Sequence, residues 1–271
     1  MTIGSWLAAS TAQLEKEGIG TARLDCLVLL EDMLKTDRAN LLAHTEIELS
    51  SEQQTQLDQQ IEKRCQHEPL AYIRQKSEFY GRQFYIDYRV LEPRPESETM
   101  IDALLALPLA KQPMIIDIGT GSGALAITAK LELPRAEVIA TDINDSSLAV
   151  AKQNAKKYNV DIEFIKGDLL LPLYAHHDLK ACVLLCNLPY VPNSFQINPA
   201  AMREPHIAIY GGEDGLDLYR NLFKQIDPLG NKPIYVLTEC LPPQQAMLTE
   251  IAKAHNYGLR ATDDFIQLFA L

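Results

Sequence analysis

The feature that most constrains this chain is a glycine loop between a short apolar run and a helical pattern. The loop reads Asp117-Ile-Gly-Thr-Gly-Ser-Gly123, with glycines at every second position. Apolar residues over Met114–Ile118 predict a strand before the loop, and a helix is expected after it over Ala124–Leu133. Such a loop places main-chain N–H groups and a helix N-terminus at the carboxyl edge of a sheet, where ligands of open α/β folds bind.

Strand and helix patterns alternate from residue 113 onward. This alternation predicts βαβ units, and therefore an α/β fold with a mostly parallel sheet covered on both faces. The last two strand patterns have no helix between them and predict an antiparallel hairpin. The further expected elements are strands at 138–143, 162–166, 181–187 and 234–239, helices at 146–158 and 216–226, and the hairpin at 260–262 and 265–270.

The first eighty residues show apolar residues at helical spacing instead. Helices are expected over Ser5–Glu17, Thr21–Leu34 and Ser50–His67, the last with Ser50 or Ser51 as its N-cap. Aromatic and β-branched residues over Phe79–Leu91 then predict a pair of short strands. The chain is therefore expected to have a small helical-bundle domain at 1–78, a β-hairpin linker at 79–95 and a Rossmann-like domain at 96–271.

Composition argues against several classes of protein. The 271 residues include 36 acidic and 25 basic side chains, a formal net charge of −11. Because nucleic-acid affinity comes largely from basic patches that release counterions, a nucleic-acid partner is not expected. No apolar run approaches the ~18–20 residues of a membrane span. The N-terminus also lacks the basic stretch that opens a secretory signal.

Cysteine and histidine usage predicts a reducing compartment and no metal. The five cysteines are scattered, with no C-x-x-C pair, which favours buried thiols in the cytoplasm over a disulfide framework or a zinc site. The pair His176-His177 has no carboxylate or cysteine partners at ligand spacing. We expect it to lie in a solvated loop.

The glycine loop alone fits two cofactors. Gly119-x-Gly121-x-x-Ala124 matches the dinucleotide fingerprint, while the alternating glycines of residues 119–123 are typical of S-adenosylmethionine sites. Asp117, two residues before the first glycine, is poorly placed for a pyrophosphate and well placed for a cationic or amino-acid ligand. This acid favours S-adenosylmethionine.

Two further acids end the next strands. Asp142 closes the second strand, where a carboxylate can accept hydrogen bonds from both ribose hydroxyls of either cofactor. A helix N-cap is the competing role for an acid at this point, and Asp145 competes for it. Asp168, at the end of the third strand, has a weaker claim to a cofactor contact.

The fourth strand ends in Cys186-Asn-Leu-Pro-Tyr190, beside the expected cofactor. The side-chain oxygen of Asn187 and the main-chain carbonyl of Leu188 can each accept a hydrogen bond, so together they can hold a planar NH₂ group. Pro189 stiffens the loop, and Tyr190 offers a ring for stacking. An ordinary strand-end turn is the alternative, but the loop and Asp142 upstream favour a catalytic motif.

The sequence resembles the HemK/PrmC family of protein-glutamine methyltransferases over nearly its whole length. Asn187–Tyr190 stands where the family has Asn-Pro-Pro-Tyr, and the match at residues 204–220 is long and specific to the family. The matching segments are His67-Glu-Pro-Leu-Ala-Tyr-Ile73, Glu78-Phe-Tyr-Gly81, Val90-Leu-Glu-Pro-Arg-Pro-Glu-Ser-Glu98, Asp117–Gly123, Asn187–Tyr190 and Glu204-Pro-His-Ile-Ala-Ile-Tyr-Gly-Gly-Glu-Asp-Gly-Leu-Asp-Leu-Tyr-Arg220.

The resemblance implies a helical domain that recognises the protein partner, ahead of a Rossmann-like methyltransferase domain. It implies methyl transfer from S-adenosylmethionine to the glutamine amide of the GGQ motif in class-1 peptide chain release factors. Apart from the resemblance, we expect a monomer in the cytoplasm. It also implies that residues 94–98 line the cofactor pocket. The expected cofactor-binding residues are Asp117, Gly119, Thr120, Gly121, Ser122, Gly123, Asp142, Asp168, Leu169 and Asn187, and the expected catalytic and substrate-binding residues are Asn187, Leu188, Pro189 and Tyr190.

Three departures from the family pattern leave alternatives open. Leu188 replaces a proline, and Asn-Leu-Pro-Tyr also resembles the rRNA adenine-N6 dimethylases, whose target is likewise a planar NH₂. Leu169 stands where some relatives have an aromatic residue beside the adenine. Glu239-Cys-Leu lacks the usual glycine. The other functions considered are adenine-N6 methylation of RNA or DNA, methylation of a ribosomal-protein glutamine, and a binding protein without activity.

Overall fold

The computed structural model describes residues 1–174, 179 and 181–271, so the expected His176-His177 loop lies outside the described residues. The chain divides into two compact units, residues 1–75 with 198–203, and residues 76–197 with 204–271. The predicted domain limits at residues 78 and 95 remain a proposal. The hairpin expected to link the domains belongs to the second unit.

The first unit is helical because its apolar residues lie on facing helix stripes. Trp6, Leu14, Leu30 and Leu57 are almost fully buried between the helices. Ser50 closes a capping box with Gln53, which confirms the N-cap expected near this position. The helices are α1 (Ile3–Lys16), α2 (Ala22–Leu34), α3 (Arg38–Ala43), α4 (Ser51–Cys65) and α5 (Leu70–Arg74), of which α3 and α5 were not predicted.

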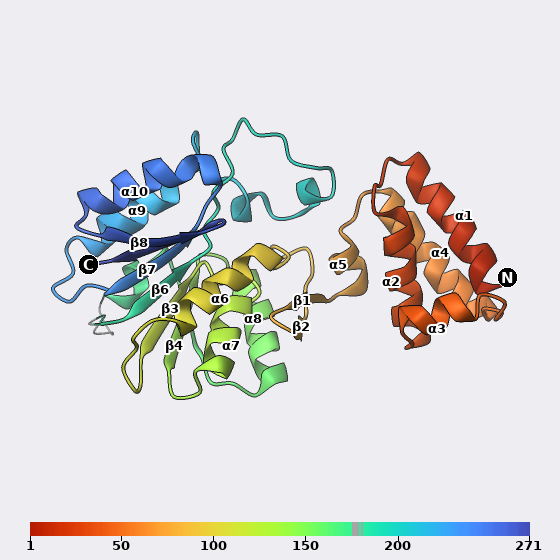
Figure 1. Cartoon of the computed structure of the whole chain (residues 1–271), viewed down its shortest axis with the longest axis horizontal. Coiled ribbons are helices and arrows are strands. Elements are labelled where there is room, and N and C mark those ends of the chain that lie inside the picture. The colour runs from red at the N-terminus through yellow and green to blue at the C-terminus, as the bar shows by residue number, and fades with distance from the viewer. Residues whose placement is uncertain (175–178, 180) are drawn as a thin grey trace. The chain divides into compact units, whose positions relative to one another are not determined.

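The second unit is a sheet between two helical layers, with α6, α7 and α8 on one face and α9 and α10 on the other (Figure 1). Its strands run in the order β5-β4-β3-β6-β7-β9-β8, with β7–β9 and β9–β8 antiparallel and the others parallel. The predicted α/β class and terminal hairpin are therefore confirmed. The strands are β3 (Met114–Ile118), β4 (Glu137–Asp142), β5 (Glu163–Lys166), β6 (Val183–Cys186), β7 (Tyr235–Glu239), β8 (Gly258–Asp263) and β9 (Ile266–Ala270).

The helices of this unit connect or flank these strands. Helix α10 was not predicted. The helices are α6 (Glu98–Leu105), α7 (Ala124–Glu132), α8 (Asp145–Tyr158), α9 (Asp217–Ile226) and α10 (Gln245–Ala254).

The sheet reverses its strand order between β3 and β6. From β3 the chain proceeds outward through β4 and β5, then returns to place β6 on the other side of β3. Ile118 at the end of β3 pairs with Cys186 at the end of β6. The loops that follow these two strands therefore start side by side at a topological switch point, where open α/β sheets bind ligands.

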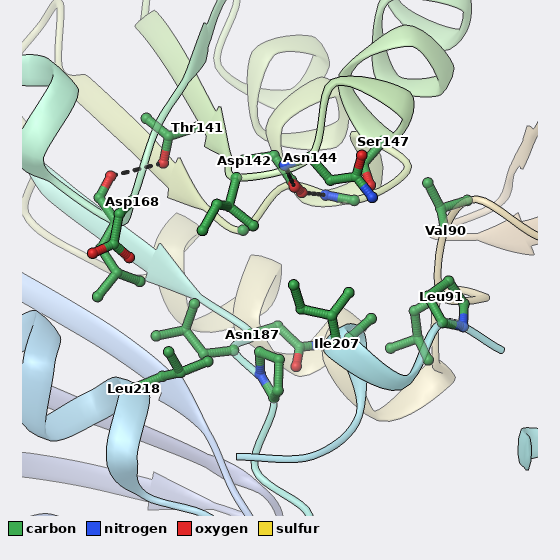
Figure 2. Close-up of a pocket in the computed structure, with 18 of the residues that line it drawn as sticks. Val90, Leu91, Thr141, Asp142, Asn144, Ser147, Asp168, Asn187, Ile207 and Leu218 are labelled. Atoms are coloured by element: carbon green, nitrogen blue, oxygen red, sulfur yellow. Dashed lines mark hydrogen bonds between the residues drawn. The ribbon is translucent and has the colours of Figure 1, made fainter. Parts of the chain in front are cut away.

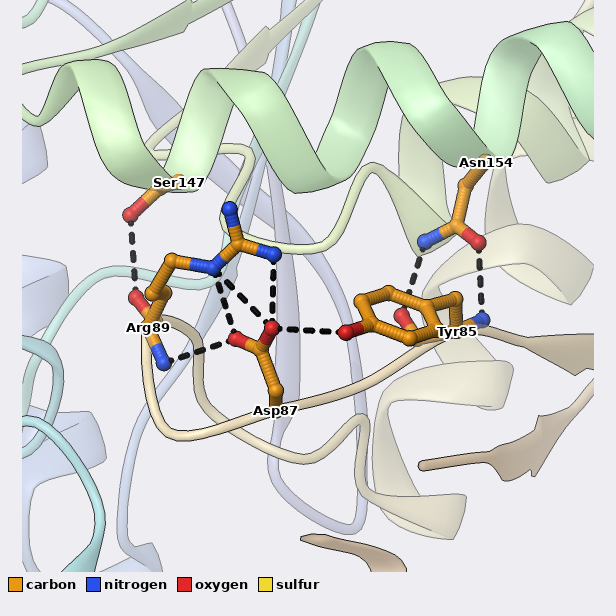
Figure 3. A network of polar contacts seen from close by, with 5 residues as sticks. All are labelled: Tyr85, Asp87, Arg89, Ser147 and Asn154. Carbon is orange, nitrogen blue, oxygen red and sulfur yellow. Dashed lines mark hydrogen bonds and ion pairs between the residues drawn. The ribbon is translucent and has the colours of Figure 1, made fainter. Parts of the chain in front are cut away.

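The hairpin predicted over Phe79–Leu91 is wrong in its limits. The strands are β1 (Ser77–Phe79) and β2 (Arg82–Phe84), and strand pairing stops at Phe84. The side chain of Asn154 on α8 accepts from the N–H of Tyr85 and donates to its carbonyl, so a side chain takes the place of a partner strand (Figure 3). The segment that follows lines a pocket instead.

Candidate active site

The glycine loop curls back against the second strand of the sheet. The N–H groups of Gly119 and Thr120 both donate to the Thr141 carbonyl, at 2.8 and 2.9 Å. Gly121 donates to Asp142 at 2.9 Å. All three loop glycines have positive φ, and a Cβ on Gly123 would lie 3.0 Å from the Ile127 side chain. The alternating glycines therefore allow a tight turn beneath which α7 can start.

These hydrogen bonds decide between the two readings of the loop. Four of the five N–H groups of residues 119–123 donate to protein acceptors, since Gly123 donates to the Thr120 carbonyl at 2.8 Å. A pyrophosphate needs several free donors from such a loop. The loop is therefore poorly suited to a dinucleotide, which agrees with the preference drawn from Asp117.

The main pocket is lined by residues of the glycine loop, of the ends of β4 and β5 and of the loop after β6. Asp142 lies in its wall, opposite Asn187 in Figure 2. Its two carboxylate oxygens accept from the N–H groups of Gly121 and Asn144, at 2.9 and 2.8 Å. Asn144 is the N-cap of α8, so Asp142 does not take the competing N-cap role. Burial raises the pKa of Asp142. A carboxylate has about four acceptor sites, so Asp142 can also accept a hydrogen bond from a ligand hydroxyl.

Asp117 lies under the loop. It is 1% exposed, and its Oδ2 accepts from the Thr120 hydroxyl at 2.6 Å and from the Ala126 N–H at 3.2 Å. Burial raises the pKa of Asp117 to about 7, although these two donors act in the opposite direction. With Thr120, Ser122 and Asn187 it borders a smaller cavity beside the main pocket. The carboxylate both holds the loop in shape and adds a polar group to this cavity.

The main pocket encloses about 850 Å³ when the open solvent at its mouth is included. Asp168 and Leu169 line it, and the carbonyl of Leu169 accepts from the Thr141 hydroxyl at 3.1 Å. Leu169 contributes an apolar surface and no aromatic ring. Leu91, Ile207 and Leu218 add further apolar wall (Figure 2). Ile143 also lines the pocket.

The segment after β2 closes another side of this pocket. Arg89, Val90 and Leu91 line it. Asp87 accepts from the Arg89 side chain and N–H and from the Tyr85 hydroxyl, and the Ser147 hydroxyl donates to the Arg89 carbonyl at 3.3 Å (Figure 3). The segment is thereby held against α8, next to Asp142.

Asn187 lies where the main pocket meets the smaller cavity. Its Nδ2 donates to Ser97 Oγ at 2.8 Å, and Ser97 Oγ donates to Glu239 Oε2 at 2.6 Å. Within the described residues no hydrogen bond ends on Asn187 Oδ1. Ser97 therefore holds one N–H of the Asn187 amide, and Oδ1 remains available as an acceptor for a ligand.

The rest of the motif divides between the pocket and the protein interior. Leu188 and Pro189 line the main pocket with Asn187. Among the described residues, Tyr190 does not line it. The Tyr190 hydroxyl donates to Glu239 Oε1 at 3.0 Å, and burial raises its pKa. Tyr190 therefore supports the loop here, while the expected stacking role stays a prediction.

The extra N–H that Leu188 brings in place of the family's proline has a partner. It donates to the Tyr219 hydroxyl at 3.4 Å. That hydroxyl lies within 3.0 Å of the Cys186 carbonyl and 2.5 Å of the Glu239 carbonyl. Tyr219 thus joins the ends of β6 and β7, and the leucine is accommodated without an unpaired donor.

Gly211 and Gly215 pack against the carbonyls of the loop that contains Asn187. A Cβ on Gly211 would lie 2.2 Å from the Pro189 carbonyl oxygen, and one on Gly215 would lie 2.0 Å from that of Tyr190. Gln244 Nε2 donates to the same Tyr190 carbonyl at 2.7 Å. Only glycine allows this close approach, so this segment shapes the loop from behind.

Sequence reasoning missed the residues that support this loop. Ser97, Gly211 and Tyr219 lie in the segments that carry the family resemblance. The resemblance indicated that these segments matter, but it did not indicate which residues they contact. Glu239 ends β7 at the same sheet edge as Asn187, and strand-end position was the signal there. Arg94 and Glu204, from two of those segments, form an ion pair at 2.8 Å with the glutamate side chain 3% exposed.

The described residues show neither a metal cluster nor a membrane helix. No group of three His, Cys, Asp or Glu side chains in the described ranges could hold a metal ion. None of the helices described has the length and apolar character needed to cross a bilayer.

Comparison with known proteins agrees with this arrangement. Residues 5–74 match the model of the PrmC N-terminal domain, and residues 97–203 match that of the methyltransferase small domain. A methyltransferase of Pyrococcus furiosus has a TM-score of 0.52 at 16% identity, covering 82% of this chain and 98% of that one, a likeness that shows the fold alone.

Curated relatives cover most of the chain. A release factor glutamine methyltransferase of Koribacter versatilis is 36% identical over 231 residues, which is 83% of this chain and 81% of the relative. One of Moorella thermoacetica is 37% identical over 227 residues, 82% of this chain and 79% of the relative. The chain therefore belongs to the HemK/PrmC family of release factor glutamine methyltransferases.

Proposed function

We propose that this protein transfers a methyl group from S-adenosylmethionine to the side-chain amide nitrogen of the glutamine in the GGQ motif of class-1 peptide chain release factors. The observation that carries the proposal is the Asn187 side chain, which lines the pocket, donates from Nδ2 to Ser97 and has an Oδ1 on which no hydrogen bond ends within the described residues. The relatives named above support the substrate.

The pocket fits the cofactor on several points. Asp142 offers carboxylate lone pairs for the ribose hydroxyls, and Asp168 and Leu169 border the space for the base. The glycine loop, with its N–H groups already bonded, suits a ligand without phosphates. When bound, S-adenosylmethionine supplies an electrophilic methyl group on a sulfonium. Asn187 lies in the wall of this same pocket, so a glutamine held there is next to the cofactor.

The chain's own residues orient the amide and stabilise its charge. An amide nitrogen is a poor nucleophile because its lone pair is delocalised into the carbonyl. Asn187 Oδ1 and the Leu188 carbonyl accept from its two N–H bonds and stabilise the positive charge that develops on it. Orienting reactants can lower a barrier by roughly 7–11 kcal/mol. The methylated nitrogen would then lose one proton to water, which leaves a neutral N-methyl amide.

The partner is a protein, recognised with the help of the helical unit. A short GGQ segment offers too little surface for selectivity, so a second contact region is needed, and residues 1–75 with 198–203 form a compact helical unit. The net charge of −11 disfavours a nucleic-acid substrate. We propose that the enzyme acts as a monomer in the cytoplasm.

Labelled-methyl transfer tests the proposal. The enzyme is incubated with labelled S-adenosylmethionine and either a purified class-1 release factor, the same factor with GGQ changed to GGA, or ribosomal RNA. Label on the GGQ glutamine alone, located by peptide mapping, is the expected result. Label on RNA adenine, or equal label on the GGA factor, would contradict it.

A further inference from the structure

A chain of hydrogen bonds lies behind the Asn187 side chain. Asn187 Nδ2 donates to Ser97 Oγ at 2.8 Å, and Ser97 Oγ donates to Glu239 Oε2 at 2.6 Å. The other carboxylate oxygen of Glu239 accepts from the Tyr190 hydroxyl at 3.0 Å. Ser97 and Glu239 are 3% and 1% exposed, so water does not compete for these groups. These hydrogen bonds therefore connect the end of β7 to the loop after β6 through the turn before α6.

The donors and acceptors in this series of hydrogen bonds favour one orientation of the Asn187 amide. Burial raises the pKa of Glu239, while the hydrogen bonds from Ser97 and Tyr190 lower it and so favour the ionised form. In that form the carboxylate only accepts hydrogen bonds, so the Ser97 hydroxyl donates to Glu239. Once that proton is used, Ser97 Oγ can only accept. The end of the Asn187 amide that faces it must then be the NH₂, because the reverse orientation would set two acceptors against each other.

We propose that Ser97 and Glu239 are positioning residues that hold the Asn187 amide with Oδ1 toward the reacting NH₂ of the substrate. This inference rests on the proposed function and deepens it. Without the serine hydroxyl, the Asn187 amide can rotate by half a turn about its last bond. The rotated amide presents an NH₂ to another NH₂, two donors that cannot pair, and the site loses its preorganisation.

Three serine variants separate positioning from simple support. Ser97→Ala removes the acceptor, and Ser97→Thr retains a hydroxyl in its place. Ser77→Ala is a matched control, since Ser77 is also buried and its hydroxyl donates to a glutamate, Glu92, at 2.9 Å. We expect Ser97→Ala to lower kcat about tenfold, with the KM for release factor and the Kd for S-adenosylmethionine within about twofold of native.

The control and the rescue complete the kinetic test. Ser97→Thr should return kcat to within about threefold of native, and Ser77→Ala should leave it within about twofold. A native kcat in Ser97→Ala would overturn the proposal. So would a loss in Ser97→Ala that threonine does not restore, or one that Ser77→Ala reproduces.

A measurement on the free protein tests the orientation without any turnover. In ¹⁵N NMR spectra, the Asn187 side-chain NH₂ protons should exchange slowly with water in the native protein and in Ser97→Thr. They should exchange at least about tenfold faster in Ser97→Ala. Equal exchange in all three would contradict the inference. If the native enzyme labels no release factor, the proposed function fails, and the exchange rates still decide the orientation.

Discussion

The two loops that follow β3 and β6 begin side by side and differ in how their polar groups are used. In the glycine loop, four of five N–H groups donate to protein acceptors, and Asp117 beneath it accepts from Thr120 and Ala126. In the Asn187 loop, the NH₂ of Asn187 and the N–H of Leu188 are likewise bonded, to Ser97 and Tyr219. Asn187 lines the pocket, and its acceptor Oδ1 has no partner among the described residues.

This difference indicates that the glycine loop shapes the pocket, whereas the Asn187 loop contacts the reacting group. A loop that satisfies its own donors is a rigid wall for a ligand held mainly by shape and by the adjacent Asp142. A loop whose donors are bonded to the protein, and whose Asn187 acceptor has no protein partner among the described residues, is suited to a group that carries N–H bonds. Preorganised acceptors of this kind stabilise developing charge without reorganisation at the moment of reaction.

Removing the Asn187 amide should have the largest effect on the rate of methyl transfer. Asn187→Ala deletes the oriented acceptor, and the loss of one such group costs ~2.7–4 kcal/mol, roughly 10²–10³ in rate. We expect no measurable methyl transfer in a standard assay and nearly native cofactor affinity by calorimetry. Rates close to native would show that the acceptor is not used.

The next largest effect is expected from a substitution that displaces the Asn187 loop. Gly211→Ala would place a Cβ 2.2 Å from the Pro189 carbonyl oxygen, so the loop must move. We expect about a 10–100-fold loss of kcat, because small misplacements of positioned groups are costly. Gly230→Ala is the matched control, since no atom lies within 4 Å of the Cβ it would add. Equal activity of the two variants would argue against this support.

The wall of the pocket should respond in affinity rather than in rate. Asp142→Ala removes a carboxylate that accepts from Gly121 and Asn144 and offers lone pairs to a ligand. We expect the Kd for S-adenosylmethionine to rise about tenfold, as for the loss of a charged hydrogen bond, with kcat at saturation within about threefold. Asp145→Ala, at an exposed acid in the next turn, is the control and should leave the Kd unchanged. A fall in kcat without a change in Kd would contradict the assignment.

The parts of the site that could be predicted are those that depend on local sequence. The glycine spacing of residues 119–123 and the position of Asn187 at a strand end follow from periodicity and turn chemistry, and the βα alternation places both at one sheet edge. The capping box at Ser50 is equally local.

The supporting contacts could not be predicted because they join distant parts of the chain. Ser97 and Glu239 are 142 positions apart, and no local pattern relates them. The predicted hairpin extends too far along the sequence for a similar reason. The Tyr85 backbone pairs with Asn154, 69 positions away, and residue types that favour strands do not reveal that a side chain has replaced the partner strand.

The smallest expected effect concerns Leu188, the most visible departure from the family motif. Leu188→Pro removes an N–H whose hydrogen bond to Tyr219 is long, at 3.4 Å, and keeps the carbonyl that the mechanism uses. It also removes a side chain that packs against Gly119 and so loosens the contact between the two loops. These effects are small, so we expect kcat and cofactor Kd within about threefold of native. A change above tenfold in kcat would mean that the leucine itself tunes the reactive loop, and that the two loops depend on each other more than their separate hydrogen bonds indicate.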